Sequence, residues 1–358
     1  MYATQAIKII TFAGFALLLI SCWYLLNNFT QRGSPSYSLE KGVTNHADPT
    51  SGKKVLPAQS PAVSTYSAWL PWWDWTKATQ SLESQPLITI VSPFTYIIQS
   101  DTRILQKRAI PQNWSEKYTV IPTISHDLDP QIMIKILTEP DTEEFYFTQL
   151  QPLITNPLYD GIELDYENIP FEYRQQLTSH VLKVAALVKQ QNKKIYLALH
   201  AKTNDLIAYA GAGSLDYPAL CAVVDNCRIM AYDFHYSGSK PGSLVPQYWL
   251  SEVLDYSLKH IPTNKLTLAL PLYGYLWTDN ANGRSLTQAQ ISQLSGTEQW
   301  DKLAISPYIQ VNENQIAYYE NSKSLQQKIN YAKSRGIYQF SFWRIGDEEQ
   351  VLQELQLN

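Results

Sequence analysis

The stretch Tyr159–Pro170, YDGIELDYENIP, decides the fold. Carboxylates recur at every second position, at Glu163, Asp165 and Glu167. Apolar side chains fill the positions between them, at Ile162, Leu164 and Tyr166. Strict alternation is typical of a β-strand, whose successive side chains point to opposite faces. The sequence therefore predicts a strand with one apolar face and one face made of carboxylates.

Strand–helix alternation surrounds this strand. Short apolar runs recur after residue 64, at 64–73, 87–98, 118–125, 159–169, 194–202, 227–236, 266–277 and 336–343. Helix-like segments lie between most of them, at 129–154, 171–193, 245–261 and 324–336. This repetition predicts an α/β fold, a (β/α)8 TIM barrel. A doubly wound open sheet is the alternative, but no glycine-rich phosphate loop follows an early strand. The long interval 276–319 predicts a small α+β insertion between strands 7 and 8.

In a barrel, the acidic face of this strand is predicted to point to the barrel axis. Ile162 and its apolar neighbours are expected to face the helices, and the carboxylates to face the barrel axis. The direction of Asp160 stays open because it lies at the start of the strand. Buried like charges are expensive and raise one another's pKa, so a purely structural strand would carry Val or Leu here. The carboxylates thus indicate an active site at the strand's C-terminal end, nearest Glu167. The alternative is an exposed strand with a solvated acidic face, which the apolar opposite face disfavours.

The chain has 358 residues and a formal net charge of −4, so no basic field suggests nucleic acid binding. Residues 1–29 contain an apolar run, Ile9–Leu26, and are expected to be an export or anchor segment. Leu19–Cys22 reads as a lipobox that would lipidate Cys22, while the continued apolar run fits an uncleaved transmembrane anchor equally well. Residues 30–64 are expected to be a disordered tether, and residues 65–358 the barrel. In each case the barrel lies outside the cytoplasm, attached to the membrane or secreted.

The two other cysteines, Cys221 and Cys227, lie close together in CAVVDNC. An oxidising compartment makes a small disulfide loop plausible, and two buried free thiols are the alternative. Without matched Cys or His partners, a zinc site is not expected.

Several motifs resemble glycoside hydrolase family 18, the chitinase-type enzymes. DGIELDYE is similar to the family's DGxDxDxE signature, and MAYD at 230–233 resembles its sixth-strand motif. PLYGYLW at 271–277 resembles the seventh strand, and 318–348 resembles the end of the catalytic domain. The residues of these motifs are most similar to those of the branch of cell-wall and spore-cortex glucosaminidases. One position departs from the pattern, since Glu163 stands where the family usually has Asp.

The resemblance implies a retaining, substrate-assisted cleavage of β-1,4 bonds next to N-acetylglucosamine, without cofactor or metal. Glu167 would be the general acid, with a pKa raised by its neighbour Asp165. Asp165 would orient the substrate's acetamide, and Glu163 would share a proton with Asp165. Tyr232 and Asp233 resemble the pair that contacts the acetamide and the oxazolinium ion. Trp343 would form the floor of the sugar pocket.

Other aromatic residues are weaker candidates for sugar contacts. Trp72 and Trp73, with Trp69 and Trp75, crowd the end of the first strand, although some of them must simply pack. Tyr273, Tyr275 and Trp277 are expected to end the seventh strand and to line the cleft. His126 and His200 at strand ends are more often structural than catalytic.

Two rival functions remain open at this stage. A non-catalytic, lectin-like protein is one, and retention of Glu167 argues against it. A platform that uses the barrel only for interactions in the envelope is the other, and it needs no aligned carboxylates. For the enzyme, the expected partners are a polysaccharide containing N-acetylglucosamine and the membrane, and the expected state is a monomer. Chitin versus peptidoglycan, and endo versus exo action, stay open.

Overall fold

The computed structural model describes residues 63–126, 128–205, 211–279, 282–348 and 350–356. All of them belong to one compact unit, Gln59–Asn358. The predictions for Cys22, the anchor segment and nearly all of the tether lie outside the described residues. Within the described ranges, no helix has the length and apolar character needed to cross a membrane.

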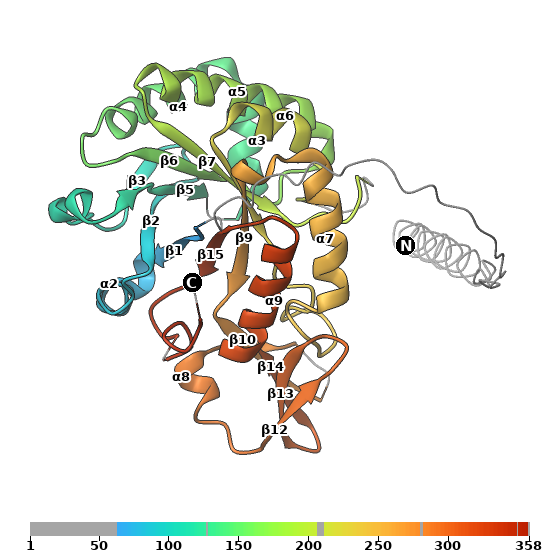
Figure 1. Cartoon of the computed structure of the whole chain (residues 1–358). Helices are drawn as coiled ribbons and strands as arrows, with labels where there is room; N and C mark the ends of the chain where they lie inside the picture. The colour runs from blue at the N-terminus through green and yellow to red at the C-terminus, as the bar shows by residue number, and fades with distance from the viewer. Residues whose placement is uncertain (1–62, 127, 206–210, 280–281, 349, 357–358) are drawn as a thin grey trace, which may run out of the picture. The chain divides into compact units, whose positions relative to one another are not determined.

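Eight parallel strands close into a barrel (Figure 1). In chain order they are β1 (Thr65–Pro71), β2 (Ile88–Ile98), β5 (Thr123–His126), β6 (Gly161–Asp165), β7 (Lys194–His200), β8 (Asn226–Met230), β9 (Leu266–Pro271) and β15 (Gln339–Trp343). Closure comes from β1, which pairs with both β15 and β2. The predicted (β/α)8 TIM barrel is confirmed, and the open sheet is excluded.

Helices cover the outside of the barrel. They are α2 (Trp75–Glu83), α3 (Pro130–Thr138), α4 (Pro140–Ile154), α5 (Arg174–Gln190), α6 (Tyr217–Val223), α7 (Gln247–His260) and α9 (Ser322–Ser334). Short strands β3 (Ile104–Gln106) and β4 (Thr119–Val120) pair with β2. Single 3-10 turns lie at Trp72–Asp74, Gln112–Glu116, Phe171–Tyr173 and Thr263–Lys265.

The helical segment predicted over 129–154 is two helices rather than one. Glu139 between them is extended, with φ −109° and ψ 109°. The residue before a proline is pushed out of the helical region by the proline ring, and Pro140 follows Glu139. Pro140 then occupies the first turn of α4, where its missing N–H has no cost.

The two faces of β6 separate as the alternation predicts. Ile162, Leu164 and Tyr166 are buried in the main apolar core between barrel and helices. The Tyr166 hydroxyl contacts the hydroxyl of Tyr146 on α4. Gly161 is required at the start of β6, because a Cβ atom there would come within 2.0 Å of the carbonyl oxygen of Lys194 on β7. Asp160 accepts a hydrogen bond from the backbone N–H of Val120 at 2.8 Å, which settles its direction.

The insertion between β9 and β15 is a second, antiparallel sheet (Figure 1). Its strands, in spatial order, are β11 (Arg284–Thr287), β10 (Tyr273–Thr278), β14 (Gln315–Tyr319), β13 (Ser306–Asn312) and β12 (Thr297–Asp301). The short helix α8 (Gln288–Ile291) follows β11. A separate small apolar core, which includes Leu286, Ile309 and Tyr319, stabilises it.

The predicted seventh strand was too long, because the barrel strand β9 ends at Pro271. The backbone N–H of Leu272 donates to the carbonyl of Trp343 at 2.7 Å, and the next strand, β10, then pairs antiparallel with β11 and β14. Tyr273, Tyr275 and Trp277 therefore belong to the insertion. Pro271, where β9 ends, and Gly274 are the only breaks between two apolar runs that otherwise look like one strand in sequence.

Candidate active site

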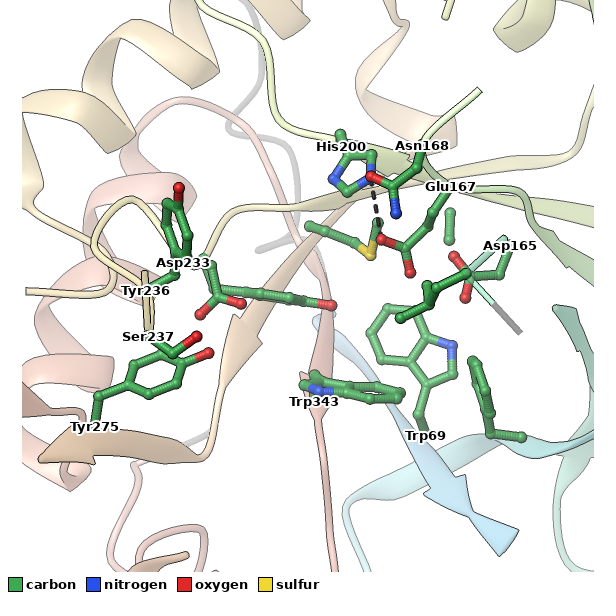
Figure 2. A pocket seen from close by; sticks show the side chains of 15 residues that line it. Trp69, Asp165, Glu167, Asn168, His200, Asp233, Tyr236, Ser237, Tyr275 and Trp343 are labelled. Carbon is green, nitrogen blue, oxygen red and sulfur yellow. Dashed lines mark ion pairs between the residues drawn. The ribbon is translucent and has the colours of Figure 1, made fainter. Parts of the chain in front are cut away.

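A cavity of about 490 Å³ opens at the C-terminal ends of the barrel strands (Figure 2). Seven of the barrel strands contribute lining residues, either from the strand itself or from the loop after it, and the insertion contributes one more wall. The lining side chains include Trp69, Phe94, Asp165, Glu167, Asn168, His200, Tyr232, Asp233, Tyr236, Ser237, Tyr275 and Trp343. Carboxylates and aromatic rings thus share one space, as hydrolysis and recognition of a sugar require.

Asp165 is almost fully buried on the axis-facing side of β6, with 5% of its surface exposed. Its Oδ1 atom has no hydrogen-bond partner among the described residues. Burial first, and then the charges of Glu167 and Glu163, raise the pKa of Asp165 well above its ordinary value. The protonated form of Asp165 is therefore favoured by its surroundings.

Glu167 follows the end of β6, and its Oε2 lies 3.1 Å from Nε2 of His200 at the end of β7 (Figure 2). Burial acts to raise the pKa of Glu167, but the contact and charge of His200, together with the charge of His126, lower it on balance. We expected Asp165 to raise the pKa of Glu167, and that expectation was wrong. The two histidines at neighbouring strand ends outweigh the effect of burial on this carboxyl.

His126 on β5 holds the backbone of Glu167. Its Nε2 lies 3.1 Å from both the backbone N and the carbonyl oxygen of Glu167. Sequence reasoning treated both histidines as structural, since a lone His at a strand end carries no signal. The parallel register of β5, β6 and β7 brings the strand ends together and gives them this role.

Glu163 has partners that the sequence did not suggest. Its Oε2 accepts hydrogen bonds from Trp69 Nε1 and Thr123 Oγ1, both at 2.7 Å. Its Oε1 lies 3.1 Å from Nη1 of Arg228. We expected Glu163 to share a proton with Asp165, but its carboxylate instead pairs with this guanidinium. Arg228 was missed, although it has the same strand parity as Met230 and Tyr232.

Tyr232 and Asp233 follow β8 and line the cavity. Asp233 lies across the cavity from Asp165 and Glu167 (Figure 2). Asp233 adopts a left-handed backbone, with φ 60°. Tyr273 donates its hydroxyl to Asp233 Oδ1 at 2.5 Å. Burial raises the pKa of Asp233 to about 6, against the opposing hydrogen bonds of Tyr273 and Tyr275. Burial also raises the pKa of the Tyr232 phenol well above its usual value. Tyr232 is thus a neutral hydroxyl that can donate a hydrogen bond.

Trp343 and Trp69 form an aromatic wall of the cavity (Figure 2). Their rings meet edge to face with centroids 5.8 Å apart, and Phe94 contacts Trp343 at 5.4 Å. Trp343 thus lies where the sequence placed it. Trp69 was predicted only as one of four weak candidates. Four tryptophans so close together do not show which of them faces the barrel axis.

The other tryptophans that were predicted to contact sugars do not line the cavity. Trp73 is half exposed and packs edge-on against Phe94 and Trp343, while Trp72 contacts Trp73; neither lines the cavity. Trp75 stacks on Trp114 away from the site. Trp277 is fully buried and donates its Nε1–H to the carbonyl of Ser239 at 3.0 Å, so it cannot contact a substrate in the cavity.

Tyr275 reaches the cavity and Tyr273 supports Asp233 from behind. Three further lining residues, Asn168, Tyr236 and Ser237, were not found from the sequence. They lie on loops after the strands, where no periodic pattern marks them.

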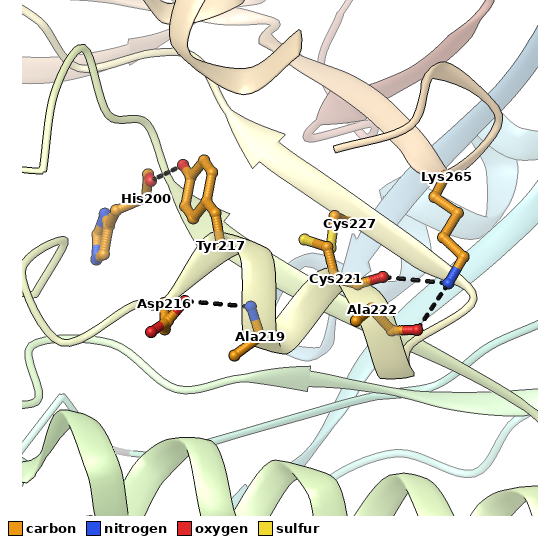
Figure 3. The surroundings of a disulfide bond; sticks show 8 residues. All are labelled: His200, Asp216, Tyr217, Ala219, Cys221, Ala222, Cys227 and Lys265. Atoms are coloured by element: carbon orange, nitrogen blue, oxygen red, sulfur yellow. Dashed lines mark hydrogen bonds between the residues drawn. A yellow bond between two sulfur atoms is a disulfide. The ribbon is translucent and has the colours of Figure 1, made fainter. Parts of the chain in front are cut away.

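A disulfide joins Cys221 on α6 to Cys227 on β8, with their Cα atoms 6.0 Å apart (Figure 3). Lys265 donates to the carbonyl oxygens of Cys221 and Ala222, each at 3.1 Å. The bond fixes α6 to the start of β8, directly before Arg228. The described residues contain no group of three or more His, Cys, Asp or Glu side chains that could hold a metal ion.

Comparison with known proteins places this site in a family. The model of glycosyl hydrolases family 18 matches residues 94–348. The "putative sporulation-specific glycosylase YdhD" of Bacillus subtilis (strain 168) is 23% identical over 286 residues, which are 73% of this chain and 66% of YdhD. The cortical fragment-lytic enzyme of the same organism is 27% identical over 201 residues, 52% of this chain and 47% of that enzyme. The chain thus spans less than two thirds of each relative's length.

The fold is shared with solved structures. The class V chitininase from Pseudomonas fluorescens Pf-5 superposes with a TM-score of 0.74 at 20% identity, covering 82% of this chain and 99% of that one. The matched family model includes β6, the MAYD segment and Trp343, which are the elements that build the cavity. The chain belongs to glycosyl hydrolases family 18.

Proposed function

We propose that the chain is a retaining glycosidase that cleaves β-1,4 bonds at N-acetylglucosamine with help from the substrate's own acetamide. The observation that carries the proposal is the placement of Glu167 and Asp165 on one face of one strand end, opposite Asp233 and Tyr232. A single-carboxylate acid with a second carboxyl beside it fits a substrate-assisted scheme. The aromatic wall of Trp343 and Trp69 offers a face on which a sugar ring can stack.

The chemistry follows from one proton held by two carboxyls. In the unliganded site the proton lies on Asp165, because the pKa of Asp165 is raised and that of Glu167 is lowered. On substrate binding the proton moves to Glu167, and Asp165 becomes the carboxylate that accepts a hydrogen bond from the acetamide N–H. The pair then titrates as a unit with two macroscopic pKa values.

Cleavage then balances as two steps. Glu167 gives its proton to the glycosidic oxygen as the C1–O bond breaks, and the acetamide oxygen bonds to C1 to form an oxazolinium ion. Asp165 offsets the positive charge, while Tyr232 donates a hydrogen bond to the acetamide. In the second step water attacks C1, Glu167 takes the water's proton, and the ring opens with retained configuration. Asp233, opposite the β6 carboxylates, adds negative charge near the ion.

The cavity continues into a neighbouring space of about 570 Å³ that shares His200, Met230, Tyr232 and Asp233 and extends to Phe234 and Trp249. Two connected spaces fit an oligosaccharide better than a single sugar. The name of the cortical fragment-lytic enzyme favours wall glycan over chitin as the polymer. We propose that the chain acts on such a glycan outside the cytoplasm, as a monomer, attached through its N-terminal segment. Conversion of Cys22 to Ala, followed by membrane fractionation, separates lipidation from an uncleaved anchor.

The test compares the full-length chain with Glu167→Gln and with Glu172→Gln, an exposed control beyond the cavity. Each protein is incubated with N-acetylglucosamine oligomers and with purified peptidoglycan, and the products are read by mass spectrometry. We expect wild type and control to cut, and Glu167→Gln to lose roughly a hundredfold or more, as expected for loss of a general acid. Binding without cleavage by all three proteins would instead identify a lectin. Neither binding nor cleavage would leave the platform function.

A further inference from the structure

A buried ion pair lies inside the barrel beneath the cavity. Arg228 on β8 is 1% exposed and Glu163 on β6 is fully buried. Arg228 Nη1 lies 3.1 Å and 3.3 Å from the two carboxylate oxygens of Glu163, and it donates to Ser92 Oγ at 2.6 Å. The guanidinium also lies 5.0 Å from the ring centroids of both Trp69 and Tyr196. Such a site is preorganised, since the planar cation is held from several sides.

The pair connects to the cavity through Trp69. The carboxylate that Arg228 neutralises also accepts the Trp69 indole N–H at 2.7 Å. Trp69 in turn lines the cavity and contacts Trp343, edge to face. Loss of either charge would leave its partner buried and unpaired, which is far costlier than loss of a surface charge. The pair therefore fixes both the strand that carries the catalytic carboxyls and the ring beside them.

We propose that Arg228 and Glu163 form a positioning pair, in which Arg228 holds the Glu163 charge away from Asp165 and Glu163 anchors Trp69 in the cavity wall. The longer Glu side chain, at a position where the family usually has Asp, is matched to the guanidinium opposite it. Asp165 then exchanges its proton with Glu167 alone. The proposal rests on the proposed function for its effect on catalysis, but the pair itself can be tested without substrate.

Removal of the Arg228 charge and removal of the Glu163 charge are expected to shift the pH profile of activity in opposite directions. Glu163 already acts to raise the pKa of Asp165. In Arg228→Met this carboxylate is uncompensated, so the pH profile of kcat/KM moves to higher pH. In Glu163→Gln the unpaired cation moves the pH profile to lower pH. In the double variant the position of the profile on the pH axis returns near that of wild type. The other titratable groups around the pair are Glu167, Tyr196, Tyr232 and, at the strands' amino ends, Asp160 and Asp225.

A matched control exists elsewhere in the chain. Lys328 and Glu320 form another fully buried ion pair, 2.5 Å apart, between α9 and the residue after β14. Lys328→Met, Glu320→Gln and their double variant delete the same charges away from the cavity. These variants are expected to lose stability without moving the pH profile. A purely structural role for Arg228 and Glu163 would make the two sets behave alike.

The substrate-free readout is the Trp69 indole N–H signal in the full-length chain labelled with ¹⁵N-tryptophan, assigned with Trp69→Phe. Glu163→Gln is expected to move this signal, and Glu320→Gln to leave it in place. If the signal moves but no variant or wild type cuts any glycan, the proposed function fails and the pair stands. A signal that stays in place in Glu163→Gln overturns the pair whatever the activity.

If a single variant does not fold, the uncharged double variant Arg228→Met/Glu163→Gln carries the test. We expect it to fold and to lose about tenfold or more in kcat, because the Trp69 indole then donates to a neutral amide, and a hydrogen bond to a charged group is about twice as strong. Wild-type kcat with an unmoved Trp69 signal would overturn the proposal. Failure of this double to fold, while the Lys328→Met/Glu320→Gln double folds, would reduce the pair to a structural role and also overturn it.

Discussion

Nε2 of His200 lies 3.1 Å from Oε2 of Glu167, so an imidazole at the end of β7 touches the carboxyl that should act as the acid. Barrel register brings them together, since β6 and β7 are adjacent and parallel. Because the His200 contact and charge lower the pKa of Glu167, the histidine contributes to the pH at which this carboxyl loses its proton. His200 is therefore part of the acid's environment rather than a bystander in the core.

Replacement of His200 by Asn should move the activity profile to higher pH. Removal of the charge raises the pKa of Glu167, so this carboxyl keeps its proton to higher pH and the basic limb of kcat/KM shifts to higher pH. The other groups facing Glu167, namely Asp165, His126, Tyr232 and Asp233, are unchanged. The measurement is kcat/KM against pH.

His260→Asn is the control for this prediction, because His260 lies on the outer helix α7, where its ring packs at a tilt against Tyr256. Its profile should match wild type. If His200→Asn lowers activity equally at every pH, His200 acts only in packing.

Replacement of Tyr273 by Phe should reduce activity mainly on the acid side. The Tyr273 hydroxyl stabilises the ionised form of Asp233, and burial already raises the pKa of Asp233 to about 6. Without the donor this pKa rises further, so Asp233 is neutral over more of the range below pH 7. The acid limb of the profile should therefore move to higher pH, with little change above pH 8.

Tyr318→Phe is the matched control, since Tyr318 stacks on Tyr308 in the insertion and not on Asp233. A uniform loss in Tyr273→Phe would instead mean that the insertion shifts when the hydroxyl is removed.

The sequence predicted the barrel and the axis-facing carboxylates because both depend on local periodicity. Alternation in 159–169 assigns each side chain to a face, and repeated β/α units leave few arrangements for the sheet. Glu163, Asp165 and Glu167 consequently lie on the side that parity assigns them. The insertion was predicted from a gap in the pattern, yet its first strand was joined to β9, because Pro271 at the junction was included in one apolar run.

The ionisation states could not be predicted in the same way. They depend on contacts such as Arg228 with Glu163, 65 residues apart, and His200 with Glu167, which only barrel closure creates. Parity alone would have identified Arg228 as axis-facing, since it precedes Met230 by two. Which carboxylate it pairs with depends on side-chain length and register, and neither has a sequence signature. Loop residues such as Asn168 follow no period at all.

Replacement of Asp165 by Asn should abolish activity and stabilise the fold at neutral pH. The pKa of Asp165 is raised in the folded state, so its contribution to stability is present at low pH and is lost as the pH rises through that pKa. Asn keeps the neutral form at every pH. The gain in the free energy of unfolding should therefore be small near pH 4 and grow as the pH rises to 8.

Thermal unfolding of both proteins at the two pH values measures this difference. Asp255→Asn, on the exposed side of α7, controls for the loss of a carboxylate as such. An equal or lower stability of Asp165→Asn at pH 8 would show that Asp165 is not held protonated by burial.

Reduction of the Cys221–Cys227 bond should destabilise the barrel. The bond closes a short loop, with a sequence separation of 6, and loop-closure entropy gives roughly 2 kcal/mol for a loop of this size. The wild-type melting temperature should therefore fall by several degrees when a reductant is added. Because Cys227 directly precedes Arg228 on β8, the loss should be accompanied by lower kcat. The measurement is thermal unfolding and activity with and without dithiothreitol.

The double variant Cys221→Ser/Cys227→Ser separates the bond from other effects of the reductant. It should start at the lower melting temperature and show no further change with dithiothreitol, while Cys22 remains in both proteins. If the variant loses stability again on reduction, the sensitive group lies elsewhere. If the wild-type melting temperature does not change with the reductant, the disulfide bond adds no stability. The two sulfur atoms would then contribute only by being buried, as two free thiols would.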